Sequence, residues 1–135
     1  MHGLALLVID MQRGLFEPPD ARYDRDGTVR RINRLAEAVR EAKGLVVFIQ
    51  HEGAKGDLFE PNTPGWEFLS ELEPRESDLV VAKRACDSFY QTGLSNLLRS
   101  HGIEELWRTG RTSTPSRSSN TTTGCGPVSS CRTAK

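Results

Sequence analysis

Apolar residues gather in a few short, nearly continuous runs along the chain. The clearest runs are residues 4–9, 45–50 and 78–82, and a fourth begins at residues 103–107. A strand that is buried on both faces has this pattern, whereas a half-exposed strand would alternate between apolar and polar residues. The pattern therefore predicts four strands of a parallel sheet, of which the first two are buried.

The segment between the first two runs has the spacing of an amphipathic helix. Its apolar positions recur every three or four residues and are Val29, Ile32, Leu35, Ala36 and Val39. We expect Thr28 to cap the helix, and Gly44 to end it as a residue that tolerates the left-handed conformation. Strand, helix and strand in succession predict a right-handed βαβ unit.

A second helix is predicted around Leu94, Leu97 and Leu98, with its end near Gly102. Two segments read as loops, residues 13–27 and residues 51–77, the latter rich in Gly, Pro and Glu. Loops as long as the second are uncommon in a compact domain and are usually functional.

The hydrophobic pattern stops near Arg108. From there to the end, Val128 and Ala134 are the only aliphatic residues, and Ser and Thr dominate. Such a stretch buries too little apolar surface to offset the entropy of ordering it. We therefore expect residues 1–108 to form an α/β domain that is incomplete at its C-terminal side, and residues 109–135 to be a disordered tail. A frameshifted or truncated reading frame is one hypothesis for the abrupt change.

Composition narrows the class of protein. The 135 residues suggest one domain, and 18 basic and 18 acidic residues give no reason to expect nucleic acid or a membrane as a partner. The odd count of three cysteines and the short apolar start, which is no signal peptide, favour the reducing cytoplasm. We expect neither a cofactor nor a metal.

Three polar residues stand at or just past the ends of predicted strands: Asp10, His51 and Lys83. Ligands of parallel α/β sheets bind beyond the carboxyl ends of the strands, so the three residues are candidates for one site. A carboxylate there can act as a general base with an ammonium group beside it. The alternatives are a loop carboxylate for Asp10 and a surface charge for Lys83. His51 is the weakest of the three, since no metal-ligand spacing surrounds it.

Several segments, taken in order, resemble the isochorismatase-like cysteine hydrolases, a family that includes isochorismatases, nicotinamidases and N-carbamoyl amidases. The resemblance covers about the first 110 residues, and the segments are LLVIDMQ at 6–12, VFIQHEG at 47–53, TPGW at 63–66, VAKR at 81–84, DSF at 87–89, TGL at 92–94, LLR at 97–99 and GI at 102–103. It implies a three-layer, Rossmann-like α/β fold around a parallel sheet of about six strands. It also implies a small amide, carbamoyl or vinyl-ether substrate, and possible association of subunits into a homo-oligomer.

The resemblance further implies a catalytic triad of Asp, Lys and Cys, of which Asp10 and Lys83 match the first two. In such a site the carboxylate takes the proton of the thiol, and the thiolate attacks an electrophilic carbon to form a covalent intermediate that water clears. Phe16 and Trp66 are candidates to line the pocket; ordinary packing is the alternative for both.

The third member of the triad is where this sequence departs from the family. Thr109-Gly110 fits the start of the nucleophile motif, but counting onward puts Ser116 where the Cys belongs. A serine hydroxyl is a far poorer nucleophile, and Cys86, Cys125 and Cys131 lie off the pattern. We therefore expect a hydrolase with an impaired site. The alternatives are a non-catalytic remnant or small-molecule binding module of the same fold, and a subunit that contributes only to an oligomer.

Overall fold

The computed structural model describes most of the first 110 residues. The described residues are 3–16, 25–85, 88–89 and 91–110, together with the backbone of three short strands at 116–118, 122–123 and 132–133. Statements about the fold refer to these residues.

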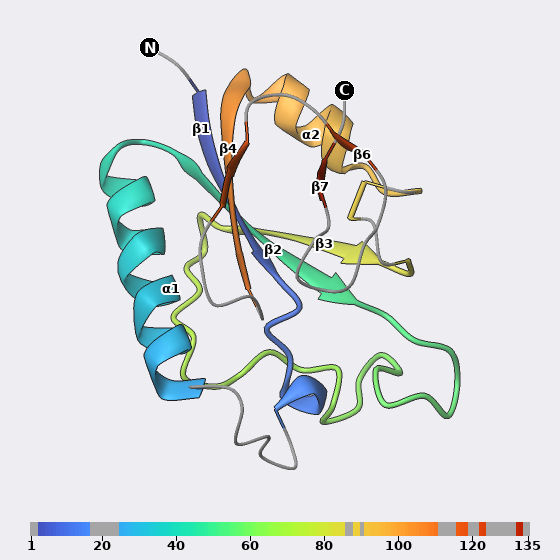
Figure 1. The fold of residues 1–135 in the computed structure, drawn as a ribbon. Helices are drawn as coiled ribbons and strands as arrows, with labels where there is room; N and C mark the ends of the chain where they lie inside the picture. The colour runs from blue at the N-terminus through green and yellow to red at the C-terminus, as the bar shows by residue number, and fades with distance from the viewer. Residues whose placement is uncertain are drawn as a thin grey trace.

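The centre of the molecule is a twisted sheet (Figure 1). Its strands are β1 (Gly3–Ile9), β2 (Leu45–His51), β3 (Leu79–Lys83), β4 (Ile103–Gly110) and β5 (Ser116–Ser118), in the order β3-β2-β1-β4-β5. The first four are parallel, which confirms the four predicted strands, and β5 pairs antiparallel to β4. Of the six or so parallel strands implied by the resemblance, the described residues therefore form four. The strands β6 (Thr122–Thr123) and β7 (Arg132–Thr133) form a separate antiparallel pair.

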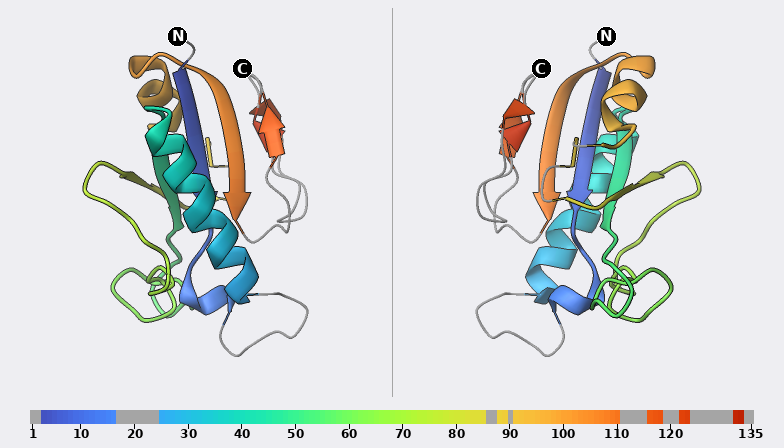
Figure 2. Two further views of the ribbon diagram at one scale, coloured as in Figure 1. Left: turned by 90° about the vertical axis from the view of Figure 1, so that its left-hand side faces the viewer. Right: turned by 90° about the vertical axis from the view of Figure 1, so that its right-hand side faces the viewer.

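Helices cover both faces of the sheet, so the fold has three layers. Helix α1 (Arg25–Glu41) packs on one face and α2 (Leu94–Ser100) on the other, as the two side views show (Figure 2). The short 3₁₀ helix η1 (Arg13–Leu15) follows the end of β1. The expected three-layer α/β fold is confirmed.

Alternation along β1 supplies both faces of the core. Leu6 and Val8 are fully buried against α1, while Ala5 and Leu7 are fully buried on the α2 side. Because side chains on both faces of the strand are buried, the continuous apolar run that predicted a doubly buried strand has a direct physical basis.

The ends of α1 differ from the prediction. The helix begins at Arg25, so Thr28 lies inside its first turn, where its hydroxyl accepts a hydrogen bond from Arg31 instead of capping the helix. At the other end the left-handed residue is Lys43, with φ of 63°, and not Gly44. Gly44 is needed for close packing, since a Cβ there would lie 2.6 Å from a methyl carbon of Val39.

Strand β4 runs to Gly110, two residues past the boundary predicted from the loss of hydrophobic pattern. The division into an α/β domain and a tail stays a prediction, because most residues after Gly110 lie outside the described part. Within the described part, no helix has both the length and the apolarity to cross a membrane.

Candidate active site

The topology brings Asp10 and Lys83 to the same edge of the sheet. Asp10 directly follows β1, and Lys83 is the last residue of β3. Strand β2 lies between them, so the lysine side chain reaches across its end. The order of strands reverses between β1 and β4, and in open α/β sheets such a switch point is where ligands bind.

The two charged groups form a buried ion pair. The ammonium nitrogen of Lys83 lies 3.1 Å from each carboxylate oxygen of Asp10 and donates a hydrogen bond to Oδ2. The Lys83 side chain is 3% exposed and that of Asp10 is 13% exposed. The other oxygen, Oδ1, is buried and accepts no hydrogen bond from any described residue. A buried acceptor without a donor is costly, so this oxygen is available to a ligand or to a nucleophile's proton.

Backbone geometry at the end of β1 aims the carboxylate. Asp10 has φ of 57°, a left-handed conformation that Asp tolerates better than most residues, and its N–H donates to the carbonyl of Ile49. Opposite it, Gly110 pairs with Ile9, and a Cβ at Gly110 would lie 2.1 Å from the Ile9 carbonyl oxygen. Glycine is therefore required where β1 and β4 end together.

Gln12 ties the segments of this edge together, and sequence reasoning gave it no role. Its side chain is fully buried. Its amide nitrogen donates to the carbonyls of His51, at 2.9 Å, and Trp66, at 2.8 Å, and its oxygen accepts from the His51 N–H, at 2.8 Å. Gln50 donates a further bond to the Trp66 carbonyl. The one signal in the sequence was a polar residue two positions after Asp10, directly beyond a buried strand.

The structure gives different surroundings to the three weaker candidates from the sequence, His51, Phe16 and Trp66. His51 ends β2, next to Lys83 in the register, and its ring packs edge-on against Phe59 with centroids 5.4 Å apart. Phe16 is 4% exposed and belongs to the core on the α1 side, in line with the packing alternative. Trp66 is partly buried, and its indole N–H is a buried donor without an acceptor among the described residues.

Ser116 is not brought beside Asp10 by the strand register. Its backbone pairs with Arg108 on β4, which in turn pairs with Leu7, three residues before Asp10. The side chain of Ser116 is outside the described residues, as are Cys86, Cys125 and Cys131. The assignment of Ser116 to the nucleophile position stays a prediction.

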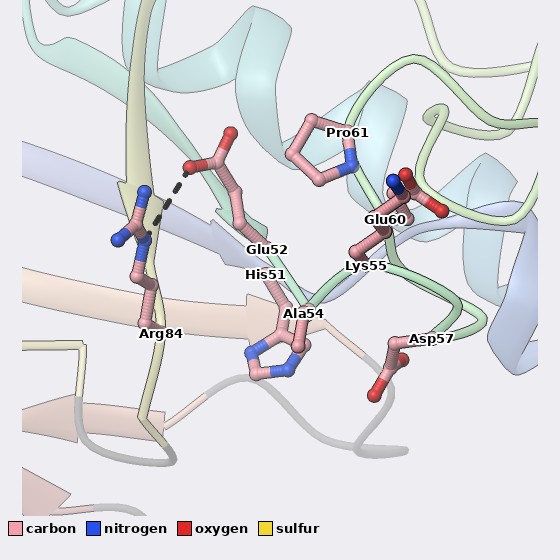
Figure 3. Close-up of a pocket in the computed structure, with 9 residues that line it drawn as sticks. His51, Glu52, Ala54, Lys55, Asp57, Glu60, Pro61 and Arg84 are labelled. Atoms are coloured by element: carbon pink, nitrogen blue, oxygen red, sulfur yellow. Dashed lines mark ion pairs between the residues drawn. The ribbon is translucent and has the colours of Figure 1, made fainter.

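A hollow of about 680 Å³, whose lining side chains Figure 3 shows, opens at the carboxyl ends of β2 and β3. It is lined by His51 and Glu52 at the end of β2 and by Arg84 directly after β3. The rest of the lining comes from the loop that follows β2, namely Gly53, Ala54, Lys55, Asp57, Glu60 and Pro61. Neither Asp10 nor Lys83 lines the hollow, but the N–H of Glu52 donates to the Lys83 carbonyl at 2.8 Å. The hollow is therefore the immediate neighbour of the candidate catalytic pair.

Two further ion pairs secure the long segment after β2 to α1. Hydrogen bonding to Asp78 raises the pKa of Arg40, although partial burial opposes the shift. Hydrogen bonding from Arg25 lowers the pKa of Glu71. Both pairs join α1 to residues 71–78, so they hold the segment that leads into β3 and Lys83.

The described residues offer no set of side chains that could bind a metal ion. The described residues contain no group of three or more His, Cys, Asp or Glu side chains placed to hold an ion. What the described edge offers is a carboxylate with one oxygen that accepts no hydrogen bond from a described residue, an ammonium group and an adjacent hollow with charged side chains in its lining.

Comparison with known proteins identifies the family to which this chain belongs. A family model described as an isochorismatase domain matches residues 4–113. The chain belongs to the isochorismatase family. This confirms the family inferred from the ordered motifs, and the match includes both Asp10 and Lys83.

Curated proteins that this chain resembles include a hydrolase and an amidohydrolase. Streptothricin hydrolase of Streptomyces noursei is 38% identical over 102 residues, which cover 76% of this chain and 40% of that protein. Ureidoacrylate amidohydrolase RutB of Variovorax paradoxus is 28% identical over 113 residues, which cover 62% of this chain and 45% of that protein. The chain thus spans less than half the length of either relative.

Solved structures share the fold. N-carbamoylsarcosine amidase from Thermoplasma acidophilum superposes with a TM-score of 0.70 at 26% identity, over 80% of this chain and 67% of the other. An isochorismatase-like hydrolase from Alkaliphilus metalliredigens has a TM-score of 0.69 at 30% identity, over 80% of this chain and 64% of the other. The fold and the hydrolase family of the chain are therefore established.

Proposed function

We propose that this isochorismatase-family chain derives from a hydrolase of small amide, carbamoyl or vinyl-ether compounds, and that its Asp10–Lys83 pair serves that reaction. The observation that carries the proposal is the buried pair itself. Lys83 lies 3.1 Å from both carboxylate oxygens at the switch point of the sheet, and Asp10 Oδ1 has no donor among the described residues.

The chemistry follows from that free acceptor. In the proposed reaction Asp10 Oδ1 receives the proton of the nucleophile, and the Lys83 ammonium stabilises the negative charge that develops beside it. The nucleophile attacks the carbonyl or related carbon, and the leaving group departs with the proton that Asp10 had taken up. Water then gives a proton to Asp10, attacks the covalent intermediate and releases the product, and the nucleophile recovers its proton from Asp10. The small-molecule substrate class is drawn from the relatives, two of which are named as amidohydrolase and amidase.

The residue at the proposed nucleophile position is expected to make hydrolysis slow. Ser116 stands where the family motif places Cys, and a hydroxyl is a much weaker nucleophile than a thiolate at neutral pH. We therefore propose that the chain as it stands is an impaired hydrolase.

A second candidate function is a small-molecule binding module without catalysis. It is favoured by Ser116 and by the register that pairs its backbone with Arg108, away from Asp10. In that case the ion pair and the hollow would bind a small molecule without a covalent step.

An activity assay distinguishes the enzyme from the binding module. Purified protein is incubated with a panel of primary amides, N-carbamoyl compounds and vinyl ethers, and product release is measured. The enzyme proposal predicts slow release of ammonia or of the vinyl-ether product that Asp10→Ala abolishes. Activity that is indifferent to Asp10→Ala would refute the site assignment. Substrate binding by the wild type without turnover, weakened by Asp10→Ala, would support the binding module.

A further inference from the structure

The hollow beside Lys83 is lined by an ion pair, between Glu52 and Arg84, that is too long for a hydrogen bond. Nε of Arg84 lies 4.0 Å from Oε1 of Glu52, which is beyond hydrogen-bond range. No described residue donates a hydrogen bond to the Glu52 carboxylate or accepts one from the Arg84 guanidinium. Figure 3 shows the two side chains facing each other across one end of the hollow.

The other charged groups of the hollow are engaged with the loop or lie at its rim. Asp57 accepts a hydrogen bond from the N–H of Phe59, and Glu60 accepts one from the N–H of Gly56, so both carboxylates hold the loop in shape. Lys55 is exposed. The facing pair of Glu52 and Arg84 is therefore the part of the lining that is best placed to recognise a ligand.

Charge balance disfavours a simple ion as that ligand. An anion at Arg84 would meet the carboxylate of Glu52, which lies 4.0 Å from the Arg84 Nε. A cation at Glu52 would meet the guanidinium of Arg84 in the same way. A neutral group that carries one donor and one acceptor side by side would meet neither repulsion.

An unsubstituted carboxamide edge has the required dimensions. Its N–H and C=O lie on the same side, with the nitrogen and oxygen about 2.2 Å apart from standard bond lengths. Two hydrogen bonds of about 2.9 Å can reach partners 4.0 Å apart if each leans outward by about 18°. The N–H would donate to Glu52 and the carbonyl would accept from Arg84.

We infer that the hollow between Glu52 and Arg84 is a binding subsite for a neutral carboxamide or ureido group, remote from the bond that is cleaved. The inference deepens the proposed function, on which it rests in treating the ligand as part of the substrate. Because Asp10 and Lys83 do not line the hollow, binding there requires neither the catalytic pair nor a nucleophile.

The test is an NMR titration of the full chain with four small probes of similar size. Butyramide carries the donor–acceptor edge, methyl propanoate lacks the donor, and butyrate and butylammonium carry a single charge. Backbone amide shifts at residues 51–61 and 84 report occupancy of the hollow. We expect butyramide to bind at least about fivefold more tightly than the other three probes, because only it satisfies both partners.

Variants of the lining residues test whether butyramide binds between Glu52 and Arg84. Glu52→Met and Arg84→Met keep the bulk of each side chain and should each weaken butyramide binding by at least about fivefold. Lys55→Ala, a matched change at the rim of the same hollow, and Asp10→Ala should leave it unchanged. The double exchange of Glu52→Arg with Arg84→Glu keeps one donor beside one acceptor and should retain binding, which guards against loss through misfolding.

Other outcomes overturn the inference in distinguishable ways. Tightest binding of butyrate would indicate an anion site at Arg84, and tightest binding of butylammonium a cation site at Glu52. Equal binding by wild type and both Met variants, or no shift in the hollow, would also refute it. Butyramide shifts confined to the neighbours of Asp10 and Lys83, and lost in Asp10→Ala, would refute the subsite while supporting the proposed function.

Discussion

The ammonium nitrogen of Lys83 lies 3.1 Å from the carboxylate of Asp10, although 73 residues separate the two in sequence. The contact exists because β1 and β3 are parallel strands of one sheet, so their carboxyl ends share an edge. The end of β2 lies between them, and a lysine side chain is long enough to cross it. The pair is thus a consequence of strand order and side-chain length together.

Gly110 is predicted to be essential where β1 and β4 end. In Gly110→Ala the new Cβ would lie 2.1 Å from the carbonyl oxygen of Ile9, and the two strands would have to separate. We expect a loss of at least about 2 kcal/mol in the free energy of unfolding, measured by urea denaturation. Gly93→Ala is the matched control, since its Cβ would meet nothing within 4 Å. Equal effects of the two changes would contradict the close approach at Gly110.

Gln12 is predicted to be the main tie between the end of β1 and the segment after β2. In Gln12→Leu the N–H and carbonyl of His51 lose their side-chain partner, while the Trp66 carbonyl keeps the bond from Gln50. We expect destabilisation by about 2–4 kcal/mol, measured by thermal or urea unfolding. Asn96→Ala, an exposed change on α2, should cost less than about 0.5 kcal/mol. A Gln12 variant as stable as the Asn96 variant would rule out this role.

The pairing of Arg25 with Glu71 is predicted to make stability depend weakly on pH. The hydrogen bond from Arg25 lowers the pKa of Glu71 below its ordinary value of 4.5. The pairing therefore stabilises the fold above that value, and the stabilisation is lost as the pH falls through the folded pKa. Because the Glu71 side chain is 47% exposed, we expect less than about 1 kcal/mol.

Comparing the unfolding free energies of wild type and Glu71→Gln at about pH 7 and about pH 3 measures this effect. The difference should favour the wild type at the higher pH and shrink at the lower. A difference that stays constant or grows toward acid would show that the ion pair contributes nothing.

Restoring a thiol tests the proposed nucleophile position. If Ser116 occupies the place of the family Cys, Ser116→Cys should raise hydrolysis of the best substrate in the panel by at least about tenfold, since the thiolate is the stronger nucleophile. The gain should disappear when Asp10→Ala is added. An inert Ser116→Cys variant, given that its fold is intact by circular dichroism, would remove Ser116 from the site.

The sequence predicted the central strands β1 and β2 well because both are buried on both faces and so are largely apolar, as Leu6 and Leu7 are. The edge strand β3 is apolar although it is only partly covered, with Val80 58% exposed. The sequence also predicted that Asp10 and Lys83 share an edge, since that follows from parallel topology. The ends of α1 were harder to predict from the sequence. The turn after the helix needs one residue in the left-handed conformation, and the sequence suggested Gly44 for it, whereas the structure has Lys43 there. Gln12 and the facing pair of Glu52 and Arg84 gain their roles from contacts across the fold, which no local pattern encodes.

The most direct measurement of the central claim is a double-mutant cycle on Asp10 and Lys83. Asp10→Asn, Lys83→Met and the double variant are compared with the wild type by urea unfolding. A buried ion pair predicts non-additive effects, with the double variant less destabilised than the sum of the single variants by about 1 kcal/mol or more. Effects that add to within about 0.5 kcal/mol would contradict the contact and with it the proposed site.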